Sequence, residues 1–229
     1  MAIVCIAGVA PGIGKTTVAE LLLAQVRGWS VARVRVADEI GPAEAAMLAG
    51  EDYRLVRQSQ VPAEEPEISR LLASGAAAAC ILLAEARGLD AGLRAMLAPM
   101  APGHNLLVEG NAFLWAHDAD IAVMVLGPGP SGKGLARVRP AVREIFPKVD
   151  IWAWNSRTDP HAEGFFEFPQ ALARMGLPAT VSNRADFHLV NPREAGHQGN
   201  AAFLDCVRER LQRRQQATGD RQRGTTSRN

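Results

Sequence analysis

Short apolar runs alternate with longer amphipathic segments along most of the chain. The apolar runs have the length of strands and lack a regular alternation with polar residues, which is typical of strands buried on both faces of a sheet. The predicted strands cover residues 3–7, 31–37, 77–83, 105–108, 121–126, 149–154 and 179–182.

Segments with helical spacing lie between these strands. In segment 15–27, for example, Val18, Leu22 and Val26 recur on one helical face. The other predicted helices cover residues 42–49, 68–74, 90–97, 135–146, 168–175 and 201–214, and the polar segment 51–67 has no assignment. Strands that alternate with helices predict a three-layer α/β/α fold with a mostly parallel central sheet.

The composition favours one domain without a membrane segment. With 229 residues, of which 48% are hydrophobic, the chain suits a single domain over 1–214, and we expect the polar tail 215–229 to be disordered. The formal net charge of +1 gives no basic signature for nucleic acid. Because no apolar run approaches the ~20 residues of a membrane span and no basic leader begins the chain, we expect a cytoplasmic protein.

The strongest chemical signal is a glycine-rich turn between the first predicted strand and the first predicted helix. Main-chain amides of such a turn converge on phosphate oxygens, and glycines permit the close approach. The turn is one residue longer than the strict GxxxxGK[ST] pattern. Lys15 is the predicted catalytic cation at the β- and γ-phosphates. The predicted nucleotide-binding residues of this segment are Gly8, Gly12, Ile13, Gly14, Lys15, Thr16 and Thr17.

A second signal follows the strand at 105–108, where the chain reads Glu109-Gly110. A carboxylate at the end of a strand beside a phosphate loop can hold Mg²⁺ or its water. We therefore predict a magnesium site made by Glu109 and the hydroxyl of Thr16. The alternative interpretation is an ordinary strand end.

The long loop spacing resembles that of dethiobiotin synthetase and the cobyrinate amidotransferases, in the branch of P-loop proteins that includes the MinD-type ATPases. The run Val108-Glu109-Gly110 is similar to a feature of dethiobiotin synthetase and of MobB, a protein of molybdenum-cofactor biosynthesis. The resemblance covers about residues 1–126 and implies a P-loop NTPase fold, Mg²⁺ and bound ATP or GTP. Because the residues after Gly8 and after Gly110 differ from dethiobiotin synthetase, it implies a class of chemistry and not that substrate.

Two polar residues after other strands are candidates for the same site. Asn155 is expected to read a purine edge through its amide, with an Asx turn as the alternative. Asp159 follows Asn155 by four residues, one more than the guanine-reading NKxD pattern requires. Asp38 and Glu39 follow the strand at 31–37, where a carboxylate could approach Mg²⁺ or the substrate. Asp38 is the predicted catalytic carboxylate that orients the acceptor, with a solvated loop carboxylate as the alternative.

Three basic residues are further candidates for anion contacts. Arg33 and Arg35 alternate along one strand and therefore share one face of the sheet. They could reach a phosphate, or form a surface pair on an edge strand. Lys133, in the glycine-rich segment 127–134, is a candidate contact for an anion.

Together these signals predict a magnesium-dependent protein that binds a purine nucleotide. The favoured interpretation is an enzyme of cofactor biosynthesis, either an NTP hydrolase or an ATP-dependent ligase, that acts with an unidentified small molecule or partner enzyme. The resemblance to MobB implies an alternative, a GTP-binding accessory protein for molybdenum-cofactor maturation with little turnover of its own. No nucleic-acid or membrane partner is expected, and both a monomer and a homodimer stay open.

Overall fold

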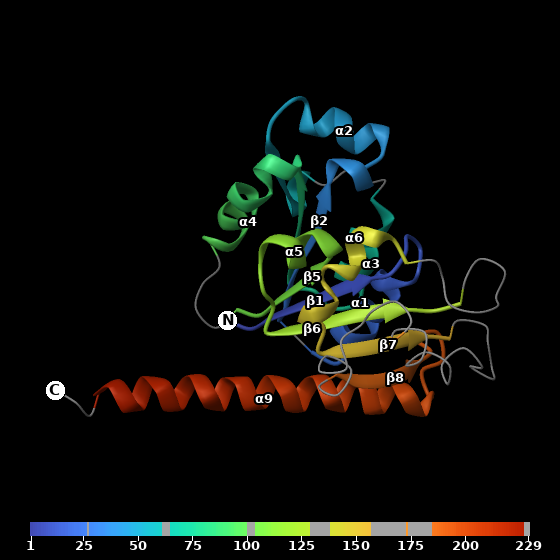
Figure 1. The fold of residues 1–229 in the computed structure, drawn as a ribbon, viewed down its shortest axis with the longest axis vertical. Coiled ribbons are helices and arrows are strands. Elements are labelled where there is room, and N and C mark those ends of the chain that lie inside the picture. The colour runs from blue at the N-terminus through green and yellow to red at the C-terminus, as the bar shows by residue number, and fades with distance from the viewer. Residues whose placement is uncertain are drawn as a thin grey trace.

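Within the described chain, eight strands form a single sheet (Figure 1). The computed structural model describes residues 1–26, 28–60, 65–99, 104–128, 138–156, 173 and 185–226. The strands lie in the spatial order β3-β4-β2-β5-β1-β6-β7-β8. Their bounds are β1 Ile3–Gly8, β2 Ser30–Val36, β3 Tyr53–Arg57, β4 Ala78–Ala84, β5 Leu106–Glu109, β6 Ile121–Leu126, β7 Ile151–Asn155 and β8 Asp186–Val190.

Neighbouring strands are parallel except at one edge, where β3 pairs antiparallel with β4. Parallel strands require crossover connections, and helices provide them. The described α-helices are α1 Lys15–Leu23, α2 Pro42–Leu48, α3 Pro66–Ala73, α4 Leu89–Leu97, α5 Asn111–Ala116, α6 Pro140–Arg143 and α9 Gln198–Thr226. Helix α1 packs against α3, and α4 packs against α5. The predicted three-layer α/β/α fold with a mostly parallel sheet is confirmed.

The central strands are buried along their whole length. Every residue of β1 and of β6 is buried, as expected for strands covered by helices on both faces. Strands β1, β2, β5, β6 and β7 all run in the same direction, so their C-terminal ends meet at one edge of the sheet. In open α/β sheets this edge is where ligands bind.

Several elements differ from the sequence prediction. Strands β3 and β8 and the short helix α5 were not predicted, and α1 ends at Leu23 rather than at residue 27. In the described part of the predicted helix 135–146, the structure has only α6 and then a 3-10 turn, Phe146–Lys148. Pro147 has no amide hydrogen, so the helical hydrogen bond from residue 147 to the Arg143 carbonyl cannot form. The predicted helix 168–175 and strand 179–182 lie outside the described residues, apart from position 173.

The last helix is longer than predicted. Helix α9 continues through Thr226, past the predicted helix end at residue 214 and across most of the predicted tail 215–229. Figure 1 shows it lying along β8 and extending beyond the sheet. Among the described residues, no helix combines the length and the apolar character that a membrane crossing requires.

Candidate functional site

A cavity of about 920 Å³ opens at the C-terminal ends of the central strands. It brings together nearly all the predicted site residues, although they come from distant parts of the chain. These are Gly8, Gly12, Gly14, Lys15, Thr16, Thr17, Asp38, Glu109 and Asn155. Ile13 is the exception, because its side chain is buried in the core rather than in the cavity wall.

The glycine-rich turn connects β1 directly to α1. Gly14, the residue before the helix, has a φ of 98°, in the left-handed region that favours glycine. No side chain caps the start of α1. The first amides of a helix have no acceptors within the helix, so this end of α1 offers donors to an anion in the cavity.

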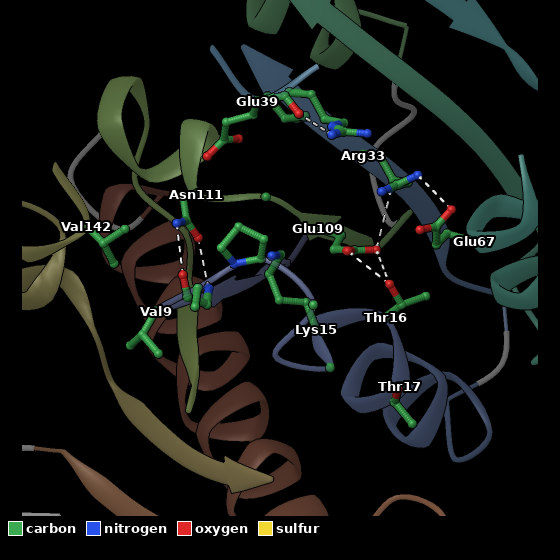
Figure 2. A pocket seen from close by; sticks show the side chains of 18 of the residues that line it. Val9, Lys15, Thr16, Thr17, Arg33, Glu39, Glu67, Glu109, Asn111 and Val142 are labelled. Atoms are coloured by element: carbon green, nitrogen blue, oxygen red, sulfur yellow. Dashed lines mark hydrogen bonds and ion pairs between the residues drawn. The ribbon is translucent and has the colours of Figure 1, made fainter. Parts of the chain in front are cut away.

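Two buried asparagines hold the turn in place. Asn111 forms a reciprocal pair of hydrogen bonds with Gly8: its Oδ1 accepts from the Gly8 amide at 2.8 Å, and its Nδ2 donates to the Gly8 carbonyl at 2.9 Å (Figure 2). At the other end of the turn, Asn155 Nδ2 donates to the Ile13 carbonyl at 3.1 Å. The structure therefore gives Asn155 a bracing contact with the loop, a use of its amide that the sequence did not indicate. Its predicted contact with a purine stays a prediction.

The two predicted magnesium ligands are direct neighbours. The hydroxyl of Thr16 donates to the Glu109 carboxylate, at 3.1 Å from Oε1 and 3.2 Å from Oε2. Gly110 lets β5 approach β2 at this point, since a Cβ there would lie 2.1 Å from the Val34 carbonyl oxygen. A hydroxyl and one carboxylate beside a phosphate site match the preference of Mg²⁺ for oxygen ligands completed by phosphates and water. The residues present therefore fit a magnesium ion.

Arg33 joins the Glu109 carboxylate to the start of α3. Its guanidinium lies 3.7 Å from Glu109, 3.1 Å from Glu65 and 3.5 Å from Glu67. Only 8% of Arg33 is exposed. Strand β2 lies between β4 and β5, so the edge-strand interpretation of Arg33 and Arg35 is wrong. That sequence reading failed because residue alternation does not reveal strand order.

Arg35 fixes the loop that follows β2. Its guanidinium pairs with Glu44 at 2.7 Å and also contacts the Glu39 carbonyl oxygen. The other Glu44 oxygen accepts from the Gly41 amide at 2.9 Å, at the start of α2. The braced segment includes Asp38, an exposed residue in the cavity wall. Glu39, the next residue in the sequence, lines the cavity as well and is drawn facing it in Figure 2.

The ammonium group of Lys15 is poorly solvated. Burial lowers the pKa of Lys15 below its usual 10.5, and the nearby carboxylates Glu109 and Glu39 partly oppose this shift. A desolvated cation gains most from a fixed counter-ion. The site around Lys15 is therefore suited to an anionic ligand.

The opposite end of the cavity contains residues that the sequence did not single out. Arg139 and Val142, at α6, and Arg193, after β8, line it together with Asn155. The sequence offered no signal for the two arginines, because they come from connections between elements. The predicted candidates Lys133 and Asp159 lie outside the described residues.

Comparisons with known proteins give only distant likenesses. No family model matches the chain, and no curated protein is significantly similar to it. Among solved structures, it is similar to the MinC:MinD cell division protein complex of Aquifex aeolicus, with 16% identity, a TM-score of 0.39 and coverage of 84% of this chain and 82% of that chain. It is also similar to LpxK from Aquifex aeolicus in complex with ATP, with 12% identity, a TM-score of 0.40 and coverage of 86% and 74%.

A third similar structure is a sugar kinase from Janibacter sp. HTCC2649, with 14% identity, a TM-score of 0.29 and coverage of 93% and 95%. With TM-scores of 0.40 or less, these likenesses are too weak to assign this chain a family or a function. The chain's own topology defines the class. A buried parallel strand, a glycine-rich turn with Gly-Lys-Thr at its end and an adjacent strand that ends in a carboxylate make a P-loop fold. The narrower likeness to dethiobiotin synthetase and MobB is not confirmed.

Proposed function

We propose that this chain binds the magnesium complex of a purine nucleoside triphosphate on the turn 8–17 and transfers its γ-phosphoryl group to water or to a small molecule. The supporting observation is the pair formed by the Thr16 hydroxyl and the Glu109 carboxylate, 3.1 Å apart at the start of α1. Thr16 and Glu109 are 93 positions apart in the sequence. They meet beside Lys15 and the start of α1, which no side chain caps.

Phosphoryl transfer depends mainly on positioning and on charge stabilisation, and this site has groups for both. The loop amides and Lys15 would bind the β- and γ-phosphates. Thr16 and Glu109 would hold the magnesium ion, which supplies neutralisation of the phosphate charge. The bonds of Asn111 to Gly8 and of Asn155 to Ile13 would keep the loop in its binding shape, so that little order has to be created on binding.

The cavity has room for a second reactant. Its volume of about 920 Å³ is near the upper end of the ~300–1,000 Å³ that is usual for small-ligand sites. The metal ligands and Lys15 lie toward β2 and β5, so we infer that the γ-phosphate and the acceptor occupy this side. The nucleoside would then extend toward Asn155 and Arg193. A carboxylate of the segment after β2, Asp38 or its neighbour Glu39, would orient the acceptor.

The test compares Lys15→Ala with Lys148→Ala as a matched control. Lys148 pairs with Asp118 outside the cavity and has no part in the proposed site. A charged hydrogen-bonding group contributes about 1.5–3 kcal/mol, so Lys15→Ala should weaken binding of ATP or GTP by roughly 10- to 150-fold in calorimetry with Mg²⁺. Lys148→Ala should bind like the wild type.

Phosphate release, followed with the same proteins, distinguishes the variants of the proposal. Turnover that needs Lys15 supports an enzyme. Tight binding with negligible turnover would favour a nucleotide-dependent accessory protein. A phosphate-release rate unchanged by Lys15→Ala would eliminate the proposed mechanism, and absence of binding by the wild-type chain would eliminate the function itself.

A further inference from the structure

Arg33 contacts three carboxylates that come from two places in the fold, the end of β5 and the start of α3. Glu109 ends β5, Glu65 immediately precedes α3, and Glu67 lies in its first turn. Figure 2 shows the guanidinium between the Glu109 side and the Glu67 side. Arg33 and Glu109 are both nearly fully buried, so water does little to screen the contact between them, whereas Glu65 and Glu67 are partly exposed.

One oxygen of Glu109 takes part in two contacts. Oε2 lies 3.7 Å from Arg33 Nε and 3.2 Å from the Thr16 hydroxyl. A divalent cation held between Thr16 and Glu109 would be close to the guanidinium, and the two positive groups repel each other. Arg33 and the metal therefore compete for the same negative charge, whereas Glu65 and Glu67 remain available to the arginine.

We propose that Arg33 is a positioning residue that competes with the divalent cation for Glu109 and transmits metal binding to the start of α3. Without metal, the guanidinium is shared between Glu109 and the two glutamates at the start of α3. With metal on Glu109, it rests on Glu65 and Glu67 alone and draws the first turn of α3 toward β2. This inference rests on the proposed function for the identity of the metal site.

A double-mutant cycle of Arg33→Gln and Glu65→Gln in the full-length chain tests the competition. The probe is Mn²⁺, measured by electron paramagnetic resonance without nucleotide and again with ATP. Arg33→Gln removes the competitor and should tighten Mn²⁺ binding by roughly fivefold or more, as is usual for coupled sites. Glu65→Gln should weaken it, because the guanidinium then turns to Glu109. In the Arg33→Gln background, Glu65→Gln should have almost no further effect.

Arg35→Gln is the control for the long-range electrostatic effect of removing a positive charge near the metal site. Arg35 is on the same strand and face, but its partners are Glu44 and the Glu39 carbonyl and not Glu109. A field effect would give Arg35→Gln a change close to that of Arg33→Gln, and it would make the two substitutions of the cycle additive. Either result overturns the proposal, as does weaker Mn²⁺ binding by Arg33→Gln.

Hydrogen exchange of the wild-type chain provides a test that needs no variant to fold. Addition of Mn²⁺ should slow the amides of α3, and an unchanged α3 would overturn the transmission step. The two hypotheses fail differently. If ATP binds but the effects of Arg33→Gln and Glu65→Gln on Mn²⁺ binding are additive, the proposed function stands and this inference is overturned. If the two effects are coupled but ATP does not bind, this inference stands and the proposed function is overturned. A wild-type chain that binds Mn²⁺ in neither condition removes both.

Discussion

Replacement of Gly14 by alanine tests whether the phosphate loop depends on the hydrogen bond from Asn155 to the Ile13 carbonyl. Gly14 has a φ of 98°, and an added Cβ would lie 2.1 Å from Asn155 Nδ2. The asparagine would have to rotate away and give up its bond to the Ile13 carbonyl. Gly12 is the matched control, because its φ of 63° is also left-handed while a Cβ there meets nothing within 4 Å.

The magnitudes separate the two substitutions. A left-handed conformation costs a residue other than glycine about 1–2 kcal/mol. A buried polar group that loses its partner costs a further ~1–3 kcal/mol. We therefore expect Gly12→Ala to lower the free energy of unfolding by about 1–2 kcal/mol and Gly14→Ala to lower it by about 2–5 kcal/mol.

Urea denaturation measures both values, and a third variant isolates the clash. In an Asn155→Ala background, space is available for the new Cβ, so Gly14→Ala should cost only the backbone term of about 1–2 kcal/mol. Equal effects of Gly12→Ala and Gly14→Ala in the native background would refute the reasoning. So would a cost of Gly14→Ala that Asn155→Ala leaves unchanged.

Three further predictions concern neighbouring groups. Asn111→Leu should lower the free energy of unfolding by about 2 kcal/mol or more, because it leaves both polar groups of Gly8 without their partner; a urea midpoint equal to that of the wild type would contradict this. Because burial lowers the pKa of Lys15, the unfolded chain holds this proton at a higher pH than the folded chain does. The unliganded protein should therefore gain stability as the pH rises from the lowered pKa toward 10.5, and Lys15→Met should remove this slope in thermal denaturation. Polyphosphate favours the ammonium form, so ATP affinity should fall over the same pH range, which calorimetry would detect. Finally, Glu39→Gln should reduce phosphate release more than Asp38→Asn, since Asp38 is exposed and Glu39 faces the cavity; the reverse order would restore Asp38 as the orienting carboxylate.

The phosphate loop could be predicted because its signal is local. A strand, a glycine-rich turn and a helix follow one another within residues 3–23, and each is recognisable from its own residues. Glu109 was recognisable for the same reason, as the polar end of an apolar run. Strand β3 was missed because it lies at an edge, where tertiary pairing with β4 rather than a continuous apolar run decides the structure.

The contacts that complete the site could not be predicted in this way. Arg33 touches glutamates 32 and 76 positions away, and Asn111 binds Gly8 across 103 positions. Such pairs depend on the strand order, which a single sequence does not specify. Asn155 shows the limit most clearly. Its place at the end of β7 could be predicted, but the position of the Ile13 carbonyl, its partner, could not.

The end of β5 has a consequence for how this chain can vary. Three consecutive residues there meet three different requirements. Glu109 contacts Thr16 at the proposed metal site, Gly110 packs closely against the Val34 carbonyl, and Asn111 hydrogen-bonds Gly8. An insertion or deletion of one residue in β5 before Glu109 would shift all three at once. The length of this stretch is therefore as constrained as its composition, and indels here should abolish the metal site and the loop geometry in a single step, whereas point substitutions impair them separately.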